Sequence, residues 1–119
     1  MNDPVDIARV YLEPWNAEGH EERLAKLSQW AENAKYQDPL MSGQGRDQIA
    51  AMIGAAKQQF PGLVFSLHGT PQGHGNNVRL SWGLGPSAGE PIAIGTDFVR
   101  VDDTGRISEV TGFLDQVPA

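Results

Sequence analysis

Apolar residues recur at helical spacing in the N-terminal half of the chain. The clearest pattern lies between Asp47 and Phe60, where apolar side chains repeat at i, i+3, i+4, i+7 and i+11. Asp3 followed by Pro4 is typical of an N-cap and a first helical residue, so another helix is expected to begin there. Pro14 is expected to end or kink this helix. Three helices are predicted, from Pro4 to about Glu13, from Glu21 to Trp30 and from Asp47 to Phe60.

After Gly62 the pattern changes from helical spacing to alternation between apolar and polar residues, which is typical of strands. Short polar turns join the alternating runs, and parallel neighbours would need long crossovers, so an antiparallel meander is expected. The predicted order is helix, helix, short strand, helix and four strands, a single α+β domain over residues 1–119 with its helices on one face of a curved sheet. The four strands are predicted at Leu63 to Thr70, Val78 to Gly85, Ile92 to Val101 and Arg106 to Leu114, with a loop at Leu40 to Gly45 and a turn at Pro71 to Asn77.

The short strand before the third helix ends at a carboxylate. Alternation places Ala34, Tyr36 and Asp38 on one face, so Asp38 lies on the apolar side. A carboxylate there must be hydrogen-bonded, paired or partly solvated, because burying a bare charge is costly. Two interpretations stay open: Asp38 starts a turn with Pro39, or it is a catalytic group.

Two further polar groups fall on apolar faces. Tyr11 lies on the buried stripe of the first helix. It is either an aromatic residue of the core or a phenol donor aimed into a cavity. Asp97 lies in the middle of a predicted strand, where Asp is unfavourable, among small and apolar neighbours. Burial there would raise the pKa of Asp97 and make it a hydrogen-bond donor. Alternatively, Asp97 anchors a loop or pairs with an arginine, the candidates being Arg79, Arg100 and Arg106.

The charge of the chain narrows the range of partners. A formal net charge of −6 leaves no basic stripe to neutralise phosphates, so neither nucleic acid nor an anionic membrane is expected as a partner. The N-terminal residues show no signal segment, and no apolar run is long enough to span a membrane. We expect a soluble, cytoplasmic protein.

No cofactor or metal is expected from the residue types present. The chain has no cysteine, which excludes disulfides, thiol nucleophiles and Cys-ligated metals. The spacing of His20, His68 and His74 does not suit a metal site, although His68 could lie at the mouth of a pocket. Gly73-His74-Gly75 reads as a hairpin turn and not as a phosphate loop, and no serine lies in a nucleophile elbow.

Three segments resemble the ketosteroid isomerase branch of the nuclear transport factor-like superfamily, which also contains the SnoaL-like polyketide cyclases. They are Tyr-Leu-Glu-Pro-Trp-Asn-Ala at 11–17, Trp-Ala-Glu-Asn-Ala-Lys-Tyr-Gln-Asp-Pro at 30–39, and Thr-Asp-Phe-Val-Arg at 96–100 with Gly-Arg-Ile at 105–107. The predicted element order is also similar to that family over essentially the whole chain. The resemblance implies a cone-shaped fold whose helices pack on the concave face of a mixed or antiparallel sheet.

The resemblance also implies roles for the three polar groups. Asp38 would be the general base, Tyr11 a donor to the substrate oxyanion, and Asp97 the protonated carboxyl of the oxyanion hole. One carboxylate can shuttle the proton of a β,γ-unsaturated ketone while neutral donors hold the dienolate. A further tyrosine supports the oxyanion donor in the isomerases, and Ile53 stands at the corresponding place here. A small apolar substrate is expected to contact Trp15, Trp30, Tyr36, Ile53, Phe60 and Phe113.

Two rival interpretations remain open. One is a SnoaL-like cyclase or another acid-base enzyme of this fold, which a low pKa of Asp97 would favour. The other is a noncatalytic ligand-binding or dimerisation domain. The superfamily is commonly dimeric, so a homodimer is expected, and Trp82 with its alternate neighbours could form either a core row or a dimer face.

Overall fold

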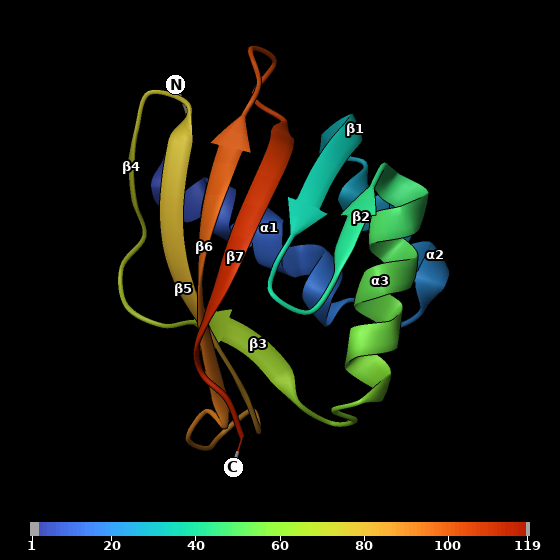
Figure 1. Cartoon of the computed structure of the whole chain (residues 1–119), viewed down its shortest axis with the longest axis vertical. Coiled ribbons are helices and arrows are strands. Elements are labelled where there is room, and N and C mark those ends of the chain that lie inside the picture. Colours follow the sequence, from blue (N-terminus) through green and yellow to red (C-terminus); the bar gives the residue numbers. More distant parts are fainter. Residues whose placement is uncertain (1–2, 119) are drawn as a thin grey trace.

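The structure of the protein, a computed structural model, describes residues 3–118 and contains a curved, open sheet with helices on one face. The sheet order is β2-β1-β7-β6-β5-β3, and β4 also pairs with β5 (Figure 1). The α+β fold predicted from the sequence is therefore confirmed. The elements are α1 (Pro4–Asn16), α2 (His20–Leu27), β1 (Trp30–Gln37), β2 (Ser42–Gln44), α3 (Arg46–Gln58), β3 (Val64–Leu67), β4 (Gln72–His74), β5 (Asn77–Gly85), β6 (Ala93–Val101) and β7 (Ile107–Gln116).

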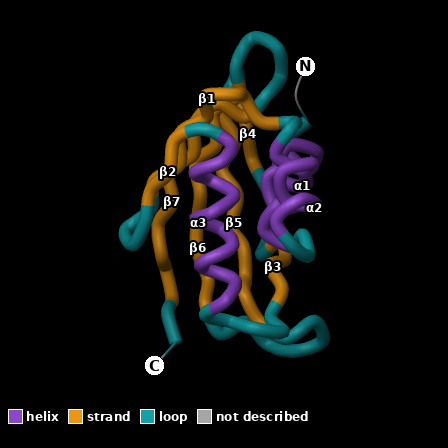
Figure 2. The backbone as a smooth tube through the Cα atoms, turned by 90° about the vertical axis from the view of Figure 1, so that its right-hand side faces the viewer, coloured by secondary structure: helices purple, strands orange, loops and turns teal. Residues whose placement is uncertain are grey.

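The predicted meander forms the larger part of the sheet. β3, β5, β6 and β7 are joined by antiparallel pairings in that order. β1 then pairs in parallel with β7, and β2 pairs antiparallel with β1, so the sheet is mixed. Figure 2 shows the three helices together on one side of this sheet. Apolar side chains of the helices and of the inner sheet face form one core.

Two strands and several element ends differ from the sequence prediction; α3 ends at Gln58 and β3 at Leu67, each earlier than predicted. β2 and β4 lie within the segments predicted as a loop and a turn, because strands of three residues are too short for alternation to reveal them. α2 ends at Leu27, and Trp30 opens β1 instead of closing the helix. α1 continues past Pro14 to Asn16. Proline removes one backbone donor, and a single missing bond near a C-terminus does not end a well-packed helix.

The ends of α1 are fixed by side chains. The Asp3 Oδ1 accepts a hydrogen bond from Val5 N at 2.8 Å, which confirms the predicted N-cap. At the other end, the buried Arg23 of α2 donates to Pro14 O at 3.2 Å and to Ala17 O at 3.0 Å. A cation beside these free carbonyls is favourable, so Arg23 holds the end of α1 in place.

Asn16, the last residue of α1, also fixes β3. Its side chain donates to Phe65 O at 2.8 Å and accepts from Phe65 N at 2.9 Å. These two bonds place the Phe65 ring 5.1 Å from the Trp15 ring.

Among the helices of residues 3–118, none is both long enough and apolar enough to cross a membrane.

Candidate active site

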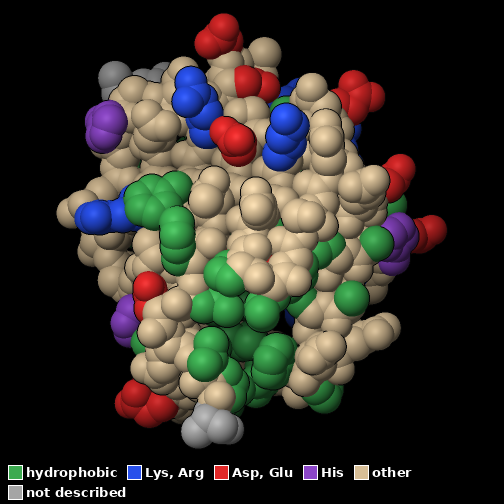
Figure 3. Space-filling model, in the orientation of Figure 1, with side chains coloured by type: hydrophobic (Ala, Val, Ile, Leu, Met, Phe, Trp, Pro, Cys, Tyr) green, Lys and Arg blue, Asp and Glu red, His purple; other side chains and the backbone are tan. Residues whose placement is uncertain are grey.

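A cavity of about 200 Å³ lies between the helices and the inner face of the sheet. Its wall is mainly apolar and includes residues of both the first helix and the last strand. Figure 3 shows hydrophobic side chains gathered around a hollow between the lower parts of β7, β3 and α3. Each of these three elements contributes to the cavity wall. Five of the residues predicted for the site line the cavity: Tyr11, Trp15, Tyr36, Asp38 and Phe60.

The structure does not bring Trp30, Ile53 or Phe113 to this cavity. Trp30 is fully buried and stacks on the Tyr11 ring at a centroid distance of 5.6 Å, so it supports Tyr11 from behind. Ile53 is fully buried in the core. Phe113 is 50% exposed and packs edge-on against Phe98, because alternation along β7 turns it to the opposite face from Gly112.

Asp38 directly follows β1 and is half-buried at the cavity wall. Its Oδ1 accepts hydrogen bonds from Leu40 N at 2.8 Å and Met41 N at 2.9 Å. Its Oδ2 accepts a hydrogen bond from the Tyr36 hydroxyl at 2.7 Å. The carboxylate therefore shapes the turn through one oxygen and lies at the cavity wall, so the two interpretations of Asp38 are compatible.

Asp97 lies next to Tyr11 and is 1% exposed. Its Oδ2 accepts a short hydrogen bond from the Tyr11 hydroxyl and a second one from Trp82 Nε1 at 3.1 Å. Asp97 is not itself part of the cavity wall, whereas Tyr11 and Trp82 both are. Its partners are these two neutral donors, and within residues 3–118 no arginine forms a salt bridge with it.

Burial raises the pKa of Asp97 to about 7, because desolvation penalises the ionised form. The hydrogen bonds from Tyr11 and Trp82 act in the opposite direction, while the charges of Asp38 and Asp115 raise the pKa further. Burial, followed by the negative charge of Asp97, also raises the pKa of Tyr11 well above its usual value. Tyr11 is therefore a neutral donor at physiological pH.

Two glycines make room for this arrangement. Gly112 of β7 stands opposite Asp97, and a Cβ there would lie 2.7 Å from Asp97 Oδ1 and 3.2 Å from Asp38 Cβ. Gly95 of β6 stands opposite Trp82, and a Cβ there would lie 2.2 Å from the indole ring. Both glycines therefore permit close approach of side chains on neighbouring strands.

Sequence reasoning missed Trp82 and the two glycines as parts of the site. The available signal was a glycine inside each of two strands predicted to be neighbours, which often marks close packing against a strand. The pairing register between β5 and β6 was needed to join Trp82 to Gly95 and then to Asp97. Trp82 therefore faces the inner cavity and also holds Asp97 in position through its hydrogen bond.

The ionisation of Asp97 predicts a pH-dependent stability. Its pKa is about 7 in the folded protein and near 3.8 in the unfolded chain, so the folded state holds the extra proton between these values. The free energy of unfolding of the wild type is therefore expected to fall as the pH rises from about 4 to 7. Between pH 5 and 8 this loss is about 2–3 kcal/mol.

Urea unfolding of wild type and Asp97→Asn at pH 5 and pH 8 measures this effect. The neutral amide lacks the titration, so the wild type should lose more stability than Asp97→Asn over this interval. Equal pH dependence of the two proteins would contradict the assigned ionisation.

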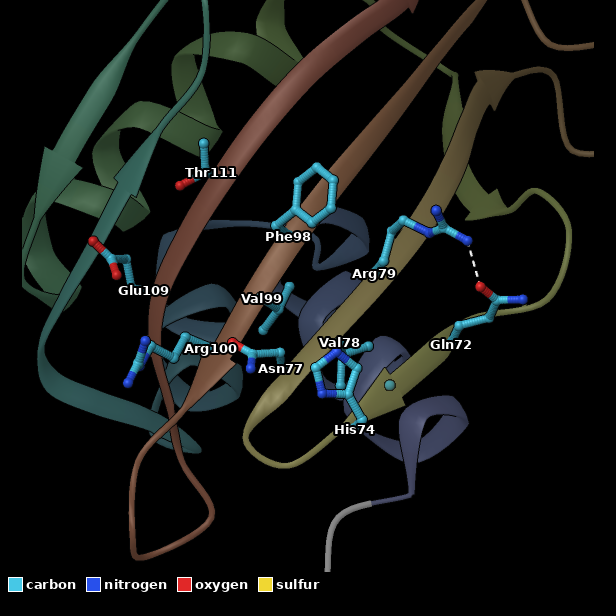
Figure 4. A pocket seen from close by; sticks show the side chains of 11 residues that line it. Gln72, His74, Asn77, Val78, Arg79, Phe98, Val99, Arg100, Glu109 and Thr111 are labelled. Carbon is cyan, nitrogen blue, oxygen red and sulfur yellow. Dashed lines mark hydrogen bonds between the residues drawn. The ribbon is translucent and has the colours of Figure 1, made fainter.

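A larger hollow of about 680 Å³ lies on the outer side of the sheet (Figure 4). Arg79, Phe98 and Arg100 lie along it, and Arg79 donates a hydrogen bond to Gln72. Asp38 and Tyr11 are not among its lining residues. His68 borders a separate polar hollow beside Arg79 and not the apolar cavity. The groups with candidate chemistry therefore gather at the smaller, inner cavity.

Metal ligation has no candidate in the described part of the chain. Between residues 3 and 118, no three His, Asp or Glu side chains are grouped closely enough to hold a metal ion. The chemistry available at the cavity is that of one carboxylate, two phenols, the two indoles of Trp15 and Trp82, and a buried carboxyl with a raised pKa.

Comparisons with known proteins agree with this architecture. Residues 8–110 match the SnoaL-like domain. A solved SnoaL-like family protein from Agrobacterium tumefaciens strain C58, provisionally named an isomerase, is 52% identical to this chain. The match covers 97% of this chain and 99% of that protein's chain, and the two structures superpose with a TM-score of 0.90. No curated protein matches the chain.

More distant structures share the fold. A provisionally named polyketide cyclase from Sinorhizobium meliloti is 19% identical, with 93% of this chain and 99% of that chain covered and a TM-score of 0.70. A Catenulispora acidiphila protein with a ketosteroid isomerase-like fold, solved with trimethylamine, is 14% identical, with 90% and 83% covered and a TM-score of 0.72. The chain therefore belongs to the SnoaL-like domain family and has the fold common to NTF2-like and ketosteroid isomerase-like proteins.

Proposed function

We propose that the protein catalyses proton transfer next to the carbonyl group of a small apolar ketone, with Asp38 as the base and Tyr11 as the donor to the oxygen. The observation that carries this proposal is that Asp38 and Tyr11 lie in the wall of the same apolar cavity. A general base must reach the proton that it removes, and an oxyanion donor must be pre-positioned in a site with little water. The isomerase name given provisionally to the 52% identical relative supports the same reaction class.

The proposed reaction moves one proton and leaves the substrate with the same atoms. Asp38 takes a proton from the carbon between the carbonyl and the double bond, and the electron pair passes into a dienolate. Tyr11 stabilises the negative oxygen by donating its hydroxyl hydrogen bond. Asp38 then returns the proton at the far end of the conjugated system, which gives the α,β-unsaturated ketone.

In this proposal Asp97 acts through Tyr11, because it lies behind the cavity wall. When Asp97 is ionised it accepts a hydrogen bond from the Tyr11 hydroxyl, so that this hydrogen is not free to donate to the substrate. When Asp97 is protonated it can donate to the Tyr11 oxygen and leave the Tyr11 proton free for the substrate. A pKa of about 7 for Asp97 therefore favours activity below this pH.

The raised pKa of Asp97 also weighs against the rival acid-base enzyme, which would use this group as an ionised base. The noncatalytic alternative keeps one supporting observation: each carboxylate already has its own tyrosine partner. Buried polar groups that satisfy one another are common in binding domains. Turnover separates the two possibilities.

The size of the cavity favours a substrate smaller than a steroid. Sites for drug-sized ligands usually measure about 300–1,000 Å³. The cavity here, about 200 Å³, lies below that range. A ketone of one or two rings fits this volume better than one of four rings.

The test is isomerisation of β,γ-unsaturated ketones with one, two and four rings, the last a ketosteroid, followed by the absorbance of the conjugated enone. We expect catalysed conjugation of at least the smaller ketones by wild type. Circular dichroism establishes that the protein assayed is folded. Folded wild type that binds these ketones without converting them would overturn the enzymatic proposal and leave a ligand-binding domain.

We also propose that the outer face of the sheet forms a homodimer. Phe98 and Phe113 lie edge to face on this side, 47% and 50% exposed, with ring centroids 5.8 Å apart. A two-fold axis would let one such pair cover the other. Sedimentation should give a dimer for wild type and a monomer for Phe98→Lys, and a monomeric wild type at micromolar concentration would contradict the proposal.

A further inference from the structure

The wall of the inner cavity is buried at one end and exposed at the other. Tyr11 and Trp15 of α1 and Tyr36 of β1 are buried wall residues. Leu40 and Val117 line the same cavity, yet they are 76% and 59% exposed. The cavity therefore has a closed end, where Tyr11 lies, and an apolar mouth that is open to water.

The mouth is built from parts of the chain that are distant in sequence. Leu40 lies in the turn between β1 and β2, and Val117 directly follows β7. Phe60, which follows α3, and Leu114 of β7 line the same cavity and are partly exposed. Figure 3 shows hydrophobic side chains at the surface around this hollow. These four residues form the rim of the cavity.

The rim suits an uncharged, apolar group. Exposed apolar side chains that gather around a hollow often mark a ligand-binding groove. Among residues 3–118, those that line the cavity include no lysine or arginine, and Asp38 is their single charged member. An anionic end group would therefore find no partner at the rim. An alkyl chain would instead remove apolar surface of the rim from water, which is favourable.

The enclosed volume of about 200 Å³ accommodates only part of a ligand that also reaches the rim. We propose that Leu40 and Val117 are specificity-determining residues, which select ketones that carry an apolar chain at the end away from the carbonyl group. This inference rests on the proposed function, which places the carbonyl oxygen at Tyr11. The ring next to the carbonyl then fills the cavity, and the chain lies across the rim.

A second copy of the chain is the other candidate occupant of the rim. The proposed homodimer uses Phe98 and Phe113 on the opposite face of the sheet, so it leaves the rim uncovered. The rim is continuous with the cavity, which favours the ligand of that cavity as its occupant. Leu40→Ser should therefore sediment as wild type does, and a smaller assembly would assign the rim to a second copy and overturn the proposal.

The experiment compares the binding of cyclohexanone with that of 4-alkylcyclohexanones whose alkyl group grows from methyl to hexyl. The alkyl group lies at the end of the ring away from the carbonyl, so it should reach the rim. We expect the affinity of wild type to rise about two- to fourfold for each added methylene, because each one covers apolar surface. Quenching of the fluorescence of Trp15 and Trp82, which line the cavity, measures the affinity at a single pH. An affinity that does not rise from cyclohexanone to the hexyl compound would overturn the proposal.

Leu40→Ser and Val117→Ser test the two side chains separately. Each variant should bind cyclohexanone within about twofold of wild type and the hexyl compound about five- to tenfold more weakly, because only the chain contacts the rim. The backbone amide of Leu40, which donates to Asp38, is kept in the variant. Equal losses for cyclohexanone and the hexyl compound would mean that these residues only shape the cavity, which contradicts the assigned selectivity.

Val5→Ser is the matched control for Val117→Ser. Val5 is 49% exposed on α1 and does not line the cavity, so the same truncation should leave the affinities of the whole series unchanged. A loss as large as that of Val117→Ser would contradict a role of the rim. These saturated ketones have no double bond to move, so their binding does not require catalysis. Wild type that binds the series with the expected rise but isomerises no ketone would overturn the proposed function and leave this inference standing.

Discussion

Asp38→Asn is expected to lower kcat for ketone isomerisation by about 10²- to 10⁴-fold, the usual contribution of a positioned general base. The amide keeps Oδ1, so Leu40 N and Met41 N retain their acceptor and the turn after β1 is preserved. The second oxygen becomes an amide nitrogen, which cannot accept the substrate proton. The absorbance of the enone at saturating ketone measures the change directly.

Asp103→Asn is the control for this substitution. Asp103 is exposed in the hairpin between β6 and β7, so the same change of charge there should leave kcat as in wild type. An Asp38→Asn variant within about fivefold of wild type would show that another group is the base, because even modest general base catalysis exceeds that factor.

Tyr11→Phe is expected to lower kcat by about 10²- to 10³-fold, the cost of removing one donor from a site of this type. Phenylalanine keeps the stacking on Trp30 and loses only the hydroxyl. The variant also deprives Asp97 of one of its two donors, which leaves Trp82 as its partner. The dienolate oxygen then loses the donor that the proposal assigns to it.

Enone formation and ketone affinity should be measured together for Tyr11→Phe. The expected result is a fall in kcat with little change in affinity, because the donor acts most strongly on the charged transition state. A loss confined to KM would instead assign Tyr11 to ordinary substrate binding.

Periodicity is sufficient to predict the elements and faces on which Tyr11, Asp38 and Asp97 lie. The apolar stripe of the first helix predicts that Tyr11 faces inward, and alternation predicts apolar faces for Asp38 and Asp97; in the structure Tyr11 and Asp97 are buried and Asp38 lies at the apolar cavity wall. These predictions held because side-chain direction repeats regularly along helices and strands. The short strands β2 and β4 contain too few residues to display a period.

The cavity itself was less predictable from the sequence. Trp30 and Ile53 are inward-facing, as expected, yet they fill the core and leave the hollow to their neighbours. Phe113 faces outward because the register of β7 against β6 puts Gly112 opposite Asp97. The periodicity of apolar residues predicts which face of an element a residue lies on. The position of a cavity depends instead on how side chains from facing elements pack against one another.

The hydrogen-bond partners of Asp97 also required the structure. The sequence offered three arginines as partners, and the observed donors are Tyr11 and Trp82, which lie 86 and 15 residues away in the chain. Such long-range pairs depend on sheet register and on where a helix crosses the sheet. Neutral donors in place of a cation are consistent with a carboxyl whose pKa is raised to about 7.

Removal of a proton adjacent to a carbonyl by Asp38 can be tested by hydrogen exchange, which reports on this step alone. A small β,γ-unsaturated ketone is incubated in deuterium oxide with folded wild type or Asp38→Asn, and proton NMR follows the signal of the carbon between the carbonyl and the double bond. We predict rapid loss of this signal with wild type and exchange no faster than the buffer rate with Asp38→Asn. Equal exchange with both proteins, or none with wild type, would contradict the assignment of Asp38 as the base.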